Sequence, residues 1–143
     1  MSGSGVSADL YVRVRQFYAR QMQALDGGRY DAYAASFTED GTFVYSPDAE
    51  PAVGREVIHE ELVRFHERFE SDPMRQRHWF DHIVLEPADD GSLTATFYAL
   101  VVNVRPGGTP EFVTSALVHD VLVEEEDGAT RMRYRRIDSD SVF

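Results

Sequence analysis

The stretch RHWFDHIVLEPADDGSLTATFYALVVNV (77–104) contains two long runs in which apolar and polar residues alternate, separated by one turn. The turn is the acidic, glycine-ended segment 89–91, a combination that favours a tight reversal of the chain. Alternation with a period of two is typical of strands with one buried face. We therefore predict strands over 77–86 and 93–104, joined as an antiparallel hairpin.

The same pattern continues toward the C-terminus. Residues 112–124 and 131–138 again alternate, and glycine turns at 106–108 and 126–128 separate the runs. Strands joined in succession by short turns pair with their neighbours in the chain. We predict that all four strands form an antiparallel meander.

The first half of the chain has helical spacing instead, with apolar residues every three or four positions. The predicted helices cover 8–25, 30–37 and about 55–70. Ser7 is the expected N-cap of the first helix, and Asp-Gly-Gly at 26–28 ends it. A turn over 38–41 and a short strand over 42–46 are expected between the second and third helices.

Helices followed by a meander of strands indicate the α+β class. Long strands twist strongly, and the helices each have one apolar face to bury. We expect a cone-shaped barrel of a highly curved mixed sheet, with the N-terminal helices enclosing one pocket. Residues 1–7 are predicted to be a disordered tail, and residues 8–143 a single domain.

Composition excludes several classes of function. The 143-residue chain has a formal net charge of −11, which argues against nucleic acid or an anionic membrane as a partner. It has no cysteine, so disulfides and thiolate chemistry are excluded. No apolar run approaches the roughly 20 residues that span a bilayer, and no signal peptide is recognisable, so we expect a cytoplasmic protein.

Three stretches resemble the nuclear transport factor 2-like superfamily. DGGRYDAYAASFTEDGTFVY (26–45) is similar to its opening helix–turn–strand segment, and GREVIHEELVRF (54–65) to its third helix. RQRHWFDHIVLE (75–86) looks like a strand of the branch that includes scytalone dehydratase. SnoaL-like polyketide cyclases share this cone. The resemblance covers about residues 8–138 and implies the fold, whereas the superfamily includes dehydratases, isomerases, cyclases and non-enzymes.

His78 is the first candidate for chemistry. On the predicted strand His78, Phe80 and His82 point to one face. A histidine in an aromatic-lined cavity suits a general acid or base near neutral pH. The resemblance implies that His78 takes the place of the catalytic histidine of scytalone dehydratase. The alternative is a buried structural histidine bonded to the backbone.

The resemblance also implies partners for this histidine. Asp26 matches the aspartate that orients the catalytic histidine, and Tyr45 matches one of the dehydratase's two tyrosines, with a hydroxyl that would hold a substrate oxygen. Leu25 stands where the dehydratase has its other tyrosine. The alternatives are that Asp26 is only part of a helix stop and that Tyr45 is a core tyrosine.

Two further polar residues interrupt apolar strands. Asn103 lies among valines near the end of the strand 93–104, and its amide can donate or accept a hydrogen bond but cannot move protons. His119 is expected to face the pocket, with Asp120 facing solvent or an interface. The resemblance places His119 where the dehydratase has an asparagine. We include both Asn103 and His119 among the candidate catalytic residues.

The predicted substrate-binding residues are Phe43, Phe80, His82 and Val101. No metal site is expected, because His78 and His82 would lie roughly 13 Å apart on a strand. No cofactor is expected either, since no glycine pattern for nucleotide binding lies between a strand and a helix.

Two hypotheses of function follow. The first, which we favour, is a cofactor-independent dehydratase, isomerase or cyclase acting on a hydrophobic, oxygenated small molecule, in polyketide or other secondary-metabolite biosynthesis. The second is a non-catalytic ligand-binding or oligomerisation module of the same fold. Under both, a homodimer or homotrimer is expected, because Trp79, Tyr98 and Val102 on the outer face of the sheet need cover.

Overall fold

The computed structural model describes residues 5–142 of the 143-residue chain. Residues 1–4 of the predicted tail, and Phe143, lie outside the described residues. The helices and strands, in chain order, are α1 (Ala8–Asp26), α2 (Tyr30–Ala35), β1 (Phe37–Val44), β2 (Ala52–Val53), α3 (Arg55–Glu67), β3 (Arg75–Pro87), β4 (Leu93–Val104), β5 (Glu111–Glu124) and β6 (Thr130–Ser139).

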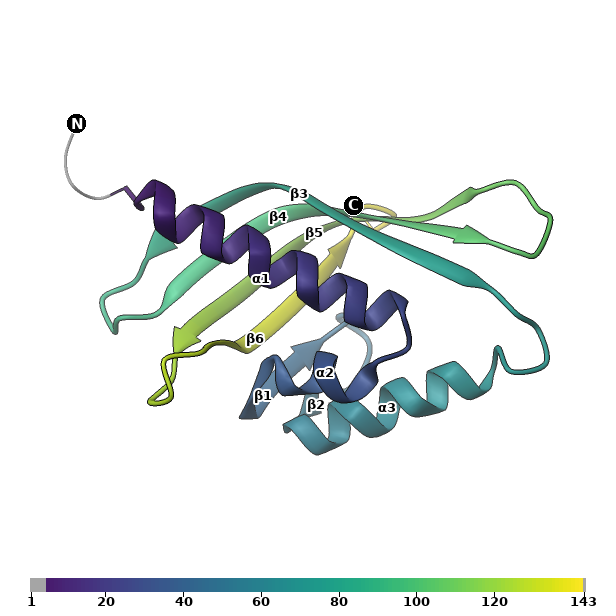
Figure 1. Ribbon diagram of the computed structural model, residues 1–143, viewed down its shortest axis with the longest axis horizontal. Helices are drawn as coiled ribbons and strands as arrows, with labels where there is room; N and C mark the ends of the chain where they lie inside the picture. Colours follow the sequence, from purple (N-terminus) through teal and green to yellow (C-terminus); the bar gives the residue numbers. More distant parts are fainter. Residues whose placement is uncertain (1–4, 143) are drawn as a thin grey trace.

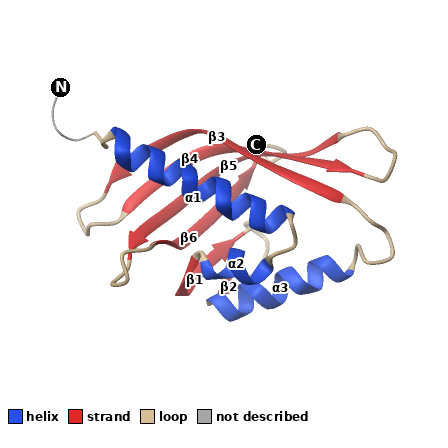
Figure 2. Ribbon diagram, viewed as in Figure 1, coloured by secondary structure: helices blue, strands red, loops and turns tan. Residues whose placement is uncertain are grey.

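The strands form one curled sheet in the order β2-β1-β6-β5-β4-β3 (Figures 1 and 2). The four long strands pair antiparallel with their neighbours, which confirms the predicted meander. β1 joins β6 in parallel, so the sheet is mixed, as expected. The sheet ends at β2 on one side and β3 on the other, so it does not close into the expected barrel.

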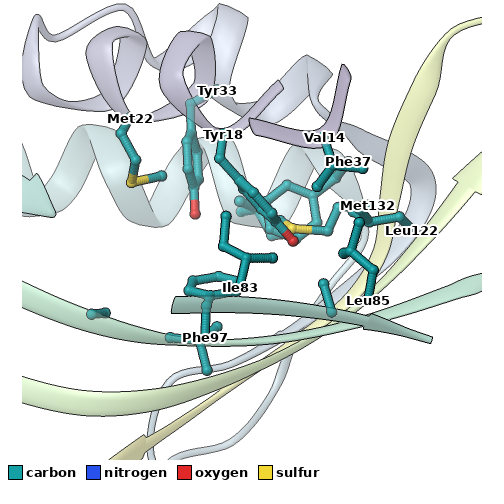
Figure 3. Close-up of a cluster of buried hydrophobic side chains, with 14 of the residues drawn as sticks. Val14, Tyr18, Met22, Tyr33, Phe37, Ile83, Leu85, Phe97, Leu122 and Met132 are labelled. Atoms are coloured by element: carbon teal, nitrogen blue, oxygen red, sulfur yellow. The ribbon is translucent and has the colours of Figure 1, made fainter. Parts of the chain in front are cut away.

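Helix α1 lies across one face of the sheet (Figure 1). The Ser7 side chain caps it by accepting a hydrogen bond from the Leu10 backbone N–H, as predicted. The helix ends at Asp26, with Gly27 as its C-cap, and Gly28 follows with a positive φ of 76°. Its buried stripe includes Val14, Tyr18 and Met22, which reach toward the sheet in Figure 3. A capped helix with one apolar stripe is thereby fixed on the sheet.

The core lies between α1 and the inner face of the sheet. Strand β4 contributes Ala95, Phe97 and Ala99 to this face, and the Phe97 ring lies 4.8 Å from that of Tyr18. Small alanines on both sides of Phe97 leave room for the α1 side chains to approach the strand. On β5 the buried residues paired with these are Ala116, Val118 and Asp120. The face that the helix covers therefore carries one buried acidic residue.

The predicted second helix and the turn after it are wrong in detail. The helix ends at Ala35, and β1 already begins at Phe37, which is fully buried and pairs with Met132. The segment predicted to be a turn lies inside β1, where the pairing register shifts between Phe37 and Thr42. A Cβ on Gly41 would lie 3.0 Å from the Phe37 ring, so any other residue here requires the Phe37 side chain to shift. Turn-forming residues here encode a bulge in a strand.

A second irregularity lies in β3. The register with β4 shifts between Asp81 and Val84, and His82 adopts a positive φ of 57°. Before the shift, His78 and Phe80 face inward; after it, Ile83 and Leu85 are buried. The strict alternation expected for this strand is therefore broken at His82, because a bulge moves later side chains to the opposite face.

Helix α3 begins after Gly54, whose φ of 98° favours glycine, and it ends at Glu67 rather than near residue 70. It packs mainly against α2 and β1. Ile58 is the only residue of α3 that is fully buried, while Phe65 remains partly exposed. The apolar face predicted for this helix is therefore only partly covered.

Candidate active site

Asp26 and His78 meet where the end of α1 reaches the edge strand β3. One carboxylate oxygen of Asp26 lies 2.5 Å from His78 Nδ1, and the other accepts a hydrogen bond of 3.1 Å from the His78 backbone N–H. The two residues are 52 positions apart in the sequence. The Asp26 side chain is 9% exposed and the His78 side chain is 18% exposed. The double contact fixes both the position and the orientation of the imidazole.

The hydrogen bonds determine which ring nitrogen of His78 is available. An ionised carboxylate only accepts, so Nδ1 must donate its proton to Asp26. In the neutral ring the lone pair then lies on Nε2. Among residues 5–142, no side chain or backbone group forms a hydrogen bond with Nε2. His78 is therefore a base with one nitrogen held and the other free.

This histidine lines an open cleft between α1 and the free edge of β3, with a volume of about 670 Å³. The floor is apolar and includes Tyr18, Met22, Phe80 and Ile83. The Phe80 ring lies edge-on to Tyr18, with the ring centroids 5.9 Å apart. Because β3 is the last strand of the sheet, side chains from both of its faces reach the cleft. A hydrophobic molecule lying on this floor would extend toward His78 at one end.

A buried polar cluster supports the floor. Arg135 donates to the Asp120 carboxylate at 2.9 and 2.8 Å, and the Tyr18 hydroxyl donates to the same carboxylate at 2.7 Å. Tyr33 and Gln21 accept two further hydrogen bonds from the guanidinium. Each group that ionises has a partner, which is the condition for keeping a charged pair in a core.

Electrostatics in this cluster follow from burial. Desolvation, and the negative charge of Asp120, raise the pKa of Tyr18 well above its ordinary value. Desolvation alone lowers the pKa of Arg135, but the facing Asp120 carboxylate more than offsets this and raises it. The arrangement therefore holds Tyr18 as a neutral phenol and Arg135 as a cation, so neither is a candidate for proton transfer near neutral pH.

Three sequence predictions about orientation are wrong. His82 lies in the bulge of β3 and is exposed on the outer face, where its ring lies 5.4 Å from that of Tyr98. His119 also points away from the cleft, and its Nε2 lies 3.0 Å from Asp138. Asp120, which was expected to face solvent or an interface, is the buried residue instead. Neither histidine belongs to the site around His78.

The remaining candidates lie at varying distances from the dyad. Val101 pairs with His78 across β3 and β4, and Asn103, two residues further, accepts a hydrogen bond of 3.0 Å from Gln76. Phe43 packs against the core. Tyr45 follows the end of β1, is 48% exposed and does not line the cleft. The structure thus brings Asp26, His78 and Phe80 together, with Val101 adjoining, while a role for Tyr45 or Asn103 stays a prediction.

The sequence analysis missed Asp120 and Arg135. A signal was present, because Asp120 alternates with Ala116, Val118 and Leu122, which are all buried. The opposite face of β5 is apolar as well, so the pattern alone did not identify the inner face.

Within residues 5–142, no group of three or more metal-ligating side chains is placed to hold a metal ion. In the same part of the chain, no helix is long and apolar enough to cross a membrane.

Comparison with known proteins gives a family match over most of the chain. The family described as "SnoaL-like domain" matches residues 7–136. Among curated proteins, no sequence matches the chain.

Several solved structures are similar to this one. ActVI-ORFA from Streptomyces coelicolor is 47% identical, with a TM-score of 0.89 over 94% of this chain and 100% of that chain. A protein from Catenulispora acidiphila, in complex with S-DNPA, is 41% identical, with a TM-score of 0.85 over 94% of this chain and 96% of that chain. An NTF2-like protein with a cystatin-like fold from Novosphingobium aromaticivorans is 18% identical and shares the fold, with a TM-score of 0.75 over 99% of this chain and 94% of that chain.

Proposed function

The chain belongs to the SnoaL-like domain family, and on that premise we propose that it is a cofactor-independent acid–base enzyme acting on a hydrophobic, oxygenated small molecule. The reaction is a dehydration, isomerisation or cyclisation in polyketide or related secondary-metabolite biosynthesis. The observation that carries the proposal is the free Nε2 of His78 at the end of an apolar cleft, with Nδ1 held by Asp26. The C. acidiphila relative in complex with S-DNPA supports a ligand-binding role for this fold.

The dyad supplies the parts that such a reaction needs. Nε2 takes a proton from a carbon next to a carbonyl group, and the imidazolium that forms is stabilised by the Asp26 carboxylate. The same Nε2–H then returns the proton to another atom of the substrate. If that atom is a departing hydroxyl, water leaves; if it is a carbon, the double bond moves. General acid–base catalysis of this kind contributes roughly 10²- to 10⁴-fold to a rate.

Substrate position follows from the shape of the cleft. Tyr18 and Phe80 present aromatic surface to a flat apolar molecule. The Asn103 amide, held by Gln76, lies on the same face of the sheet as His78 and Val101. We propose that it hydrogen-bonds an oxygen of the substrate, as the sequence predicts.

Isotope exchange tests the proposal without knowledge of the natural substrate. In D₂O, 2-tetralone exchanges its activated C–H protons for deuterium, and NMR follows the rate. The wild-type protein should accelerate this exchange above buffer, and His78→Ala should reduce the acceleration by about 10²-fold or more. His82→Ala is the matched control, because this histidine lies on the same strand but faces outward. Full activity in His78→Ala would sink the assignment.

We also propose that the outer face of the sheet is covered by another copy of the chain. Trp79 is 66% exposed and Tyr98 is 60% exposed, and β3–β4 pairing places Leu100 beside Trp79. Phe112 on β5 extends this apolar surface and is 75% exposed. An apolar surface that can meet itself across a symmetry axis suits a homodimer or homotrimer.

A further inference from the structure

The cleft beside His78 carries positive charge in a strongly acidic protein. Among the described residues that line it, Arg15, Arg29 and Arg77 are cationic, and Asp26 is the only acidic one. The chain as a whole has a formal net charge of −11. Both oxygens of Asp26 already accept hydrogen bonds from His78. The local excess of cations is therefore not balanced within the cleft.

Two of these arginines are available to a ligand. Arg15 forms an ion pair of 3.1 Å with Asp81 at the far end of the cleft. Arg77 forms one hydrogen bond, from Nη1 to the Gln76 carbonyl oxygen. The Nε of Arg29 lies 3.8 Å from the point where a Cβ on Gly27 would be, so this side chain folds over the end of α1. Across residues 5–142, no carboxylate forms an ion pair with Arg29 or Arg77.

The charge pattern continues around α1. Arg29 also borders a second hollow, and the described residues that line it include Arg13 and Arg20 but no aspartate or glutamate. An anion approaching the protein is repelled by most of its surface and attracted to this side. The arginines of the two hollows therefore form one positively charged side of the protein, which extends to Arg29 and Arg77 beside His78 and Asp26.

We propose that the substrate carries a carboxylate, which Arg29 and Arg77 bind at the dyad end of the cleft. Its apolar body lies on Tyr18 and Phe80, and its reacting C–H bond faces Nε2 of His78. Guanidinium groups suit this task because their planar donors match the two oxygens of a carboxylate. The inference rests on the proposed function, since it takes the cleft beside His78 as the substrate site.

Binding of a matched pair of probes tests this charge preference. 2-Naphthylacetate and 2-naphthylacetamide have nearly the same shape but differ in charge, and isothermal titration or ligand-observed NMR measures both dissociation constants. The wild-type protein should bind the carboxylate about tenfold more tightly than the amide. Arg29→Gln and Arg77→Gln should each weaken carboxylate binding about fivefold, and Arg77→Lys should restore part of the loss. Binding of the amide should change less than twofold.

The controls separate a local contact from a general change in charge. Arg64→Gln and Arg75→Gln each remove one exposed arginine, from α3 and β3 respectively, outside the cleft. They should leave carboxylate binding within twofold of wild type. Equal losses in the controls and in the cleft variants would overturn the proposal. Equal affinity for the two probes, or no binding of either at millimolar concentration, would also overturn it.

The outcome is independent of whether His78 transfers protons. His78→Ala should keep the preference for 2-naphthylacetate while losing isotope exchange in 2-tetralone. A wild-type protein that prefers the carboxylate but exchanges no protons would contradict the proposed function and leave the anion site standing. Isotope exchange without any preference for the carboxylate probe would contradict the anion site and leave the proposed function standing.

Discussion

Replacement of Asp120 by asparagine tests the buried cluster under the cleft. The Asp120 and Arg135 side chains are 0% and 1% exposed, and the carboxylate accepts three hydrogen bonds from Arg135 and Tyr18. Asparagine keeps the shape but leaves the guanidinium without its counter-charge. Breaking one side of a buried ion pair costs about 3–5 kcal/mol. The total stability of a domain is only about 5–15 kcal/mol, so this is a large fraction.

Urea denaturation, followed by circular dichroism, measures the loss. With a slope of about 2 kcal/mol per molar urea, the midpoint should fall by roughly 2 M. Asp138→Asn is the control, because its pairs with Arg136 and His119 are partly exposed and should contribute about 1 kcal/mol or less. Asp120→Leu combined with Arg135→Met removes both charges and should recover most of the stability. A loss of stability in Asp120→Asn no larger than that in Asp138→Asn would refute the role of the buried ion pair.

Two other predictions concern pH and assembly. Burial raises the pKa of Tyr18 above its ordinary value of 10.0, so its contribution to stability is complete below pH 10 and is lost as the pH rises above 10 toward the folded pKa. The chain has no lysine, so tyrosines are the main side chains that titrate in this pH range. The free energy of unfolding should therefore fall less between pH 8 and 11 in Tyr18→Phe than in wild type. An equal dependence of this free energy on pH in the two proteins would contradict the prediction. Tyr98→Glu puts a charge on the outer face and should reduce the oligomer to monomers in sedimentation velocity, whereas a wild-type monomer would refute the proposed assembly.

The sequence predicted the strands well because their periodicity is local information. The predicted boundaries 93–104 are those of β4, whereas β5 is one residue longer than predicted at one end and β6 is one residue longer at both ends. Bulges are harder to foresee, since they depend on what the strand packs against. At 38–41 the turn-forming residues lie within β1 because Phe37 is buried against Met132. In β3 the bulge at His82 reversed an alternation that was correct up to Phe80.

On β5, the sequence did not show which face of the strand is buried. Leu117 and Val121 make its outer face almost as apolar as the inner one, so alternation did not reveal which side is buried. His119 was therefore assigned to the cleft and Asp120 to the outside, the reverse of what the structure shows. A charged residue is normally exposed, and only its pairing with Arg135, from the next strand, makes burial of Asp120 possible.

The Asp26–His78 contact lay beyond local reasoning. Its members are 52 residues apart, and Asp-Gly-Gly reads equally well as a helix stop. The resemblance to a known family suggested the pair, and the structure brings the two side chains together. The family resemblance suggested no role for the arginines around this pair. Their place in the cleft followed only from the three-dimensional arrangement of α1 and β3.

Asp26 holds Nδ1–H of His78 and leaves Nε2 free in the cleft. Long-range ¹H–¹⁵N correlation NMR of the imidazole, at a pH where the ring is neutral, measures this directly. The wild-type ring should be protonated at Nδ1 and unprotonated at Nε2, with this preference weakened in Asp26→Asn. A ring protonated at Nε2 in the wild-type protein would contradict it.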